Sequence, residues 1–103
     1  MSDPANGVAR RSLSRKLLLR VLDVQPDLSR HVLALRLAEH ESRLAQYESG
    51  ERLMPLDVQA RLAEFVLMSE PRLARGARHL RLQVQAARRY EAGDVVRHMT
   101  SPP

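Results

Sequence analysis

The sequence contains no cysteine and only three aromatic residues, Tyr47, Phe65 and Tyr90. Without thiols, neither a disulfide framework nor a thiolate metal site can form. Leucine, valine and alanine fill the apolar positions, so the core must be aliphatic, and such a composition favours helices over strands. The length of 103 residues predicts one domain with a single modest core.

Several functional classes lack their sequence signals. No apolar run reaches the length of a membrane span, and the N-terminal stretch lacks the apolar core of a signal peptide, so a cytoplasmic protein is expected. His40 and Glu41 begin like a zinc-protease helix, but Leu44 stands where the second histidine belongs. There is no glycine-rich phosphate loop and no nucleophile elbow. Enzymatic activity, a cofactor and a metal site are therefore not expected.

Basic residues exceed acidic ones, 17 to 12, which gives a net charge of +5. All of the basic residues except Lys16 are arginine, which forms bidentate pairs with phosphate and guanine. A GC-rich genome would explain the same bias equally well. The middle of the chain, residues 24–68, has five basic and seven acidic residues, so the basic character belongs to the flanks. A polyanionic partner is indicated.

The apolar spacing predicts an all-α, compact bundle of about five helices. Serines at 12, 29 and 69 are predicted N-caps, Pro26 ends the first helix, and Gly50 ends a short helix over residues 41–48. We expect four segments: a flexible N-terminal arm (1–9), a helix-turn-helix domain (10–68), a longer C-terminal helix (69–92) and, after the break at Gly93, a flexible tail (93–103).

The C-terminal helix carries an apolar seam of period 3.5, formed by Leu73, Ala77, Leu80 and Val84. Two interpretations fit this seam: a lid over the core of the same chain, or a dimer contact. The dimer is preferred, because palindromic DNA sites would require it. The arginines on the other faces of the helix could alternatively bind phosphates.

Residues 28–52 have the spacing of two short helices joined by a tight turn, with Leu33, Ala34, Leu37 and Leu44 on their inner faces. The Leu33-Ala34 pair, Leu37, Leu44 and the stretch from Tyr47 to Arg52 match one pattern without a gap. On these positions the sequence resembles the lambda-repressor-like (Cro-repressor, or xenobiotic-response-element) family of helix-turn-helix DNA-binding proteins. The resemblance covers about 55 residues, from the first helix to about Leu67.

Three positions depart from the family pattern. Ala38 stands where the family usually has the glycine of the inter-helix turn, at a cost of about 1 kcal/mol. Glu39 replaces a commonly apolar residue, which predicts a wetter turn. The family pairs the glutamate before the glycine, here Glu48, with an arginine on the first helix; Arg20, or another base, would have to serve.

The resemblance implies that base edges are read from the start of the second short helix, by Glu41, Ser42, Arg43 and Gln46. Arg43 has the fork for guanine, Gln46 suits adenine, and Glu41 suits cytosine but repels phosphate. The candidate phosphate-binding residues are Arg10, Arg11, Arg15, Lys16, Arg30 and Arg52.

These expectations favour a regulator of transcription that binds double-stranded DNA as a homodimer. Two alternatives stay open. The chain could be a protein-interaction or antitoxin-like module that keeps the fold while Glu39 and Glu41 spoil the DNA-binding surface. It could also be an architectural protein that binds DNA non-specifically through its basic flanks. RNA binding is disfavoured by the few aromatic side chains.

Overall fold

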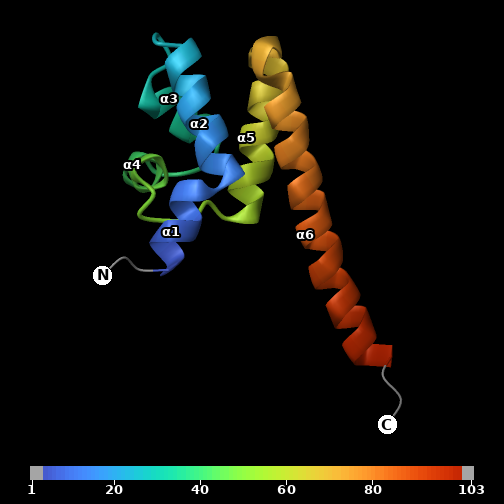
Figure 1. Cartoon of the computed structure of the whole chain (residues 1–103). Coiled ribbons are helices and arrows are strands. Elements are labelled where there is room, and N and C mark those ends of the chain that lie inside the picture. Colours follow the sequence, from blue (N-terminus) through green and yellow to red (C-terminus); the bar gives the residue numbers. More distant parts are fainter. Residues whose placement is uncertain (1–3, 101–103) are drawn as a thin grey trace.

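The computed structural model describes the backbone of residues 4–100 and the side chains of residues 7–91, and it confirms the all-α fold (Figure 1). Within the described residues there is no strand. The elements are α1 (Pro4–Arg11), α2 (Leu13–Val24), α3 (Arg30–Arg36), α4 (Glu41–Ser49), α5 (Leu56–Ser69), the 3-10 helix η1 (Pro71–Leu73) and α6 (Ala74–Thr100). The helices before α6 form a compact bundle, and α6 is the longest element, with 27 residues.

Serine caps fix two of the helix starts as predicted. The Ser12 hydroxyl accepts the backbone N–H of Arg15, and the Ser29 hydroxyl accepts that of Val32, which satisfies donors that a helix start leaves free. The predicted cap at Ser69 is wrong. Ser69 is the last residue of α5, and its hydroxyl donates to the carbonyl of Phe65 instead.

The two ends of the chain differ from the predicted boundaries. Residues Pro4–Arg11, assigned mostly to a flexible arm, form α1; Pro4 occupies the first turn, where a missing N–H has little cost, and Ala9 is buried. At the other end, α6 continues through Gly93 to Thr100. A glycine inside a helix costs only about 1 kcal/mol, which does not by itself end the helix.

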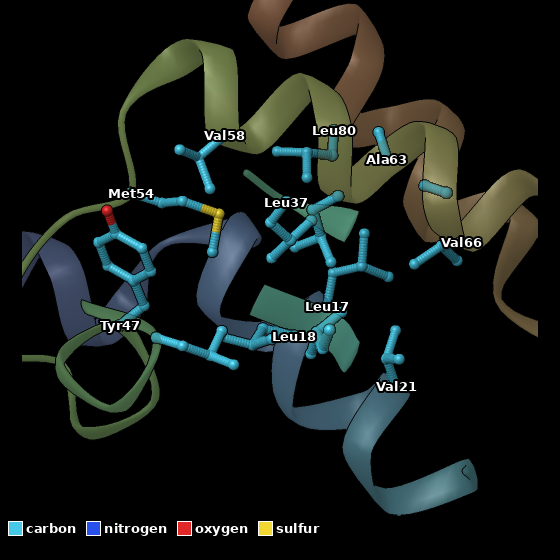
Figure 2. Packing of buried hydrophobic residues seen from close by; sticks show 14 of the residues in the cluster. Leu17, Leu18, Val21, Leu37, Tyr47, Met54, Val58, Ala63, Val66 and Leu80 are labelled. Carbon is cyan, nitrogen blue, oxygen red and sulfur yellow. The ribbon is translucent and has the colours of Figure 1, made fainter. Parts of the chain in front are cut away.

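A single, mainly aliphatic core lies between α2, α3, α4, α5 and α6. Leu18, Leu37, Leu62 and Leu80 are fully buried in it, and Figure 2 shows Tyr47 and Met54 together at one edge of the cluster. Tyr47 is the one aromatic residue of this cluster that is fully buried; it is 1% exposed. The core therefore fixes the orientation of α4, to which Tyr47 belongs.

The predicted seam of the last helix is buried within the chain. Leu73, Ala77, Leu80 and Val84 all belong to the core, where α6 and η1 pack against α5. The lid interpretation describes this contact, and the preferred dimer interpretation does not, because these four side chains already have partners. Figure 1 shows α6 continuing beyond the bundle, away from the other helices.

Within the described part of the chain, no helix combines the length and the apolar character that a membrane crossing requires.

Candidate functional site

Helices α3 and α4 and the turn between them form the unit in which the sequence places the functional residues. Leu33 and Ala34 from α3 and Leu44 from α4 are buried against each other and the core. These side chains hold the two short helices together and leave the outer side of α4 free. The predicted inner faces are confirmed.

The turn after α3 has the geometry that the sequence register predicts. Ala38 has a left-handed backbone with φ of 53°. The N–H of Glu39 donates to the carbonyl of Ala34 at 2.9 Å, and the N–H of Ala38 donates to that of Leu35 at 3.2 Å. This pair of bonds is a Schellman motif, which satisfies the last carbonyls of a helix. Gly50, with φ of 83°, ends α4 by the same motif.

The first turn of α4 presents three of the four predicted base-reading side chains to solvent. Glu41, Ser42 and Arg43 are all exposed, and Arg43 forms no ion pair among the described residues. Gln46 differs. It is half-buried, and its side-chain oxygen is buried without a hydrogen-bond partner in the described part of the chain. Gln46 would have to rotate outward to reach a base.

Glu41 forms an ion pair across the turn that sequence reasoning missed. Its Oε1 lies 2.9 Å from Nδ1 of His31 on α3, and both side chains are exposed. The ten-residue separation of the two residues gives no sequence signal for this contact. When His31 carries a proton, it offsets the negative charge of Glu41 on this surface.

Of the partners left open for Glu48, Arg20 or another base, the structure shows another base, Arg30. Arg30 Nη2 lies 2.9 Å from Glu48 Oε1, which joins the start of α3 to the last turn of α4. The hydrogen bond to Glu48 raises the pKa of Arg30. Arg30 is still 59% exposed, so its guanidinium can meet a further anion.

Glu39 accepts a hydrogen bond from the buried phenol of Tyr47, with Oε2 2.6 Å from the hydroxyl oxygen. This bond lowers the pKa of Glu39, and the nearby charge of Arg43 contributes in the same direction. Burial and the bond to Glu39 together raise the pKa of Tyr47 to about 12. The apolar residue of the family pattern is thus replaced by a polar contact that gives the phenol its partner.

Arg15 joins α1, α2 and α4. Its Nε donates to the carbonyl of Glu48 at 2.8 Å, and its Nη1 donates to the carbonyl of Arg10 at 3.1 Å. Two of the three guanidinium nitrogens of Arg15 are thus bonded within the chain, where they position the C-terminal end of α4. The role of Arg15 as a phosphate ligand stays a prediction.

The other candidate phosphate ligands lie on the surface. Arg10, Arg11, Lys16 and Arg52 are exposed, and Arg11 also donates to the carbonyl of Gly7 within α1. Arg10 packs against Gly50 so closely that a Cβ added at Gly50 would collide with the Arg10 side chain and would lie 3.3 Å from the Arg10 Cα. This close approach places α1 directly beside the end of α4.

Among the described residues, no group of three or more histidine, aspartate or glutamate side chains is placed to hold a metal ion. Comparison of the chain with protein families, curated proteins and solved structures finds no match.

Proposed function

We propose that this chain is a regulator of transcription that binds double-stranded DNA, with α4 in the major groove. The observation that carries the proposal is the exposed first turn of α4, where Ser42 and Arg43 project from a helix anchored by Leu44 and Tyr47. An anchored helix with a free outer side fits a major groove about 12 Å wide, and an arginine there can hold guanine by two hydrogen bonds.

Residues 24–68 carry more acidic than basic side chains, which argues against DNA binding. Most of these acidic side chains have partners within the chain. Five of the seven acidic side chains of residues 24–68 have side-chain partners: Glu39 with Tyr47, Glu41 with His31, Glu48 with Arg30, Asp57 with Arg61 and Glu64 with Arg81. These carboxylates are held beside donors. Arg30 and Arg61 already belong to this segment, so only the pairing of Glu64 with Arg81, from α6, adds a positive charge beside it.

The exposed cations beside α4 supply the phosphate contacts of the proposal. Arg30 lies at the start of α3, Arg52 follows α4, and Arg10 lies against the end of α4. A homodimer, which palindromic sites favour, would use a surface other than the buried seam. Sedimentation equilibrium with and without duplex measures whether the chain is a monomer or a dimer.

The test is binding of the whole chain to duplexes selected from a random pool, followed by fluorescence anisotropy over a salt series. We expect Arg43→Ala to weaken binding to the selected duplex by about 1–3 kcal/mol while it changes binding to unselected duplex little, because a base contact carries selectivity. The matched control is Arg78→Ala, an exposed arginine on α6. It should leave selectivity unchanged.

Two outcomes would contradict the proposal. One is an absence of preference for duplex over heparin. The other is an equal effect of Arg43→Ala and Arg78→Ala, which would favour non-specific binding through the flanks. Purification of one stoichiometric protein partner whose binding tolerates Arg43→Ala would favour the interaction-module alternative, in which Glu41 faces a protein.

A further inference from the structure

A surface hollow away from the exposed turn of α4 lies between α3 and α5. Its volume is about 530 Å³, which falls in the usual range of about 300–1,000 Å³ for small-molecule sites. It is lined by Arg36, Ala60, Arg61, Glu64, Phe65, Met68 and Ser69. All but Arg36 come from α5 and recur at helical spacing, so the hollow follows one face of that helix over more than two turns.

Part of the apolar lining of the hollow is open to solvent. The Met68 side chain is 85% exposed, and Phe65, one turn earlier, is half-buried. Methionine is flexible and polarisable, so it adapts to apolar ligands of irregular shape. This end of the hollow suits an apolar group.

The opposite end of the hollow is cationic. Arg61 Nη1 lies 3.3 Å from the carbonyl of Leu37, which places Arg61 beside the C-terminal end of α3, where Arg36 lies. Two of the charges are already matched, since Arg61 pairs with Asp57 and Glu64 pairs with Arg81. Arg36 is exposed and has no ion pair among the described residues. The unmatched charge of the hollow is therefore positive.

We propose that this hollow binds a small organic anion with an apolar body, with the anionic head at Arg36 and Arg61 and the body along Phe65 and Met68. A neutral apolar molecule would leave Arg36 unmatched, and a cation would be repelled. The hollow adjoins the α3–α4 turn through the bond from Arg61 to Leu37. The inference does not rest on the proposed function, because the binding can be measured without DNA.

The test uses the whole chain with ¹³C-labelled methionine methyl groups, titrated with sodium octanoate and observed by NMR. We expect a saturable shift of the Met68 methyl signal, while the signal of Met54, which is 3% exposed in the core, stays in place. Octanol, which has the same apolar body without the charge, should bind at least fivefold more weakly. Arg36→Ala should weaken octanoate binding at least fivefold, and the control Arg78→Ala should leave it unchanged.

Three results would overturn the inference: no saturable shift at Met68, equal binding of octanol and octanoate, or equal effects of Arg36→Ala and Arg78→Ala. Simultaneous shifts of Met54 and Met68 would also overturn it, because they indicate general loosening of the core. Since Arg36 is exposed, the variant is expected to fold, and its far-ultraviolet circular dichroism checks this.

Discussion

Ala38 holds a left-handed backbone conformation that its Cβ disfavours. With φ of 53°, it occupies the position of a Schellman motif that glycine fills at the end of α4. The Cβ of a non-glycine residue costs about 1–2 kcal/mol in this region. Glycine avoids this cost, but its unfolded chain has more conformational freedom, which lowers the stability by about 0.5–1 kcal/mol. The Cβ of Ala38 therefore strains the turn that sets the angle between α3 and α4.

We expect Ala38→Gly to raise the free energy of unfolding by about 0.5–1 kcal/mol, the difference between these two effects. Urea denaturation measures the change as a higher midpoint with an unchanged slope. Ala45→Gly is the matched control, since Ala45 is exposed within α4 and the same substitution there should destabilise by about 1 kcal/mol. If both variants lower the midpoint, Ala38 is not strained in solution.

At the scale of elements, Glu70 joins α2 to the junction of α5 and η1. It is buried, and its carboxylate accepts from Arg72 Nε at 2.7 Å, from Arg72 Nη2 at 3.1 Å and from Gln25 Nε2 at 3.2 Å. These bonds, chiefly those from Arg72, lower the pKa of Glu70 to about 2 from an ordinary value of 4.5. The carboxylate thus stabilises the corner at which the chain reverses into α6.

The lowered pKa of Glu70 predicts a specific acid dependence of stability. The folded chain takes up this proton less readily than the unfolded chain, so the contribution is complete above pH 4.5 and is lost as the pH falls toward 2. Glu70→Gln should destabilise the protein at pH 7, and its difference from the wild type should shrink between pH 4.5 and 2.5.

Thermal unfolding across this pH range measures the difference for Glu70→Gln. Glu91→Gln serves as the control, because Glu91 is exposed and makes no ion pair among the described residues. A constant difference between Glu70→Gln and the wild type over the whole range would show that the Glu70 carboxylate is not responsible.

Several helix ends can be predicted from the residues around them, whereas the side-chain partners depend on tertiary contacts. The serine caps at Ser12 and Ser29 and the left-handed Gly50 depend on the residue type and its near neighbours, and the sequence predicts all three. The left-handed Ala38 is expected only from the family resemblance, because alanine itself gives no such signal. The predicted break at Gly93 is wrong, because a glycine inside a helix costs only about 1 kcal/mol and α6 continues through it.

The side-chain partners of the candidate site could not be predicted in the same way. Glu48 pairs with Arg30 across 18 residues, and Arg15 reaches the carbonyl of Glu48 across 33. Such contacts depend on how α1, α2, α3 and α4 pack, and the sequence offers several arginines for each acceptor. For the same reason, Gln46 could be assigned to α4 but not to its half-buried side.

At the scale of the whole molecule, the chain combines a bundle with a helix that extends past it. The molecule measures 58 × 37 × 22 Å, and the long dimension follows from α6 (Figure 1). Among the described side chains, none beyond Val84 belongs to the buried core. The described side chains by which α6 joins the core therefore lie in the first half of the helix.

A pair of truncations tests this division. A chain that ends at Glu91 keeps the whole described core, so its free energy of unfolding should stay within about 0.5 kcal/mol of the full chain. A chain that ends at Arg72 loses Leu73, Ala77, Leu80 and Val84. Burial of one leucine contributes about 1.5–3 kcal/mol, so this loss approaches the total of about 5–15 kcal/mol that small proteins have.

The shorter chain should therefore lack a cooperative transition, whereas the chain ending at Glu91 should melt like the full protein; thermal circular dichroism distinguishes the two. Melting at two protein concentrations reports separately on self-association. Loss of cooperativity in the chain ending at Glu91 would mean that the far half of α6 makes a stabilising contact. A second copy of the chain would then be the first candidate for its partner, because no other described helix reaches it (Figure 1).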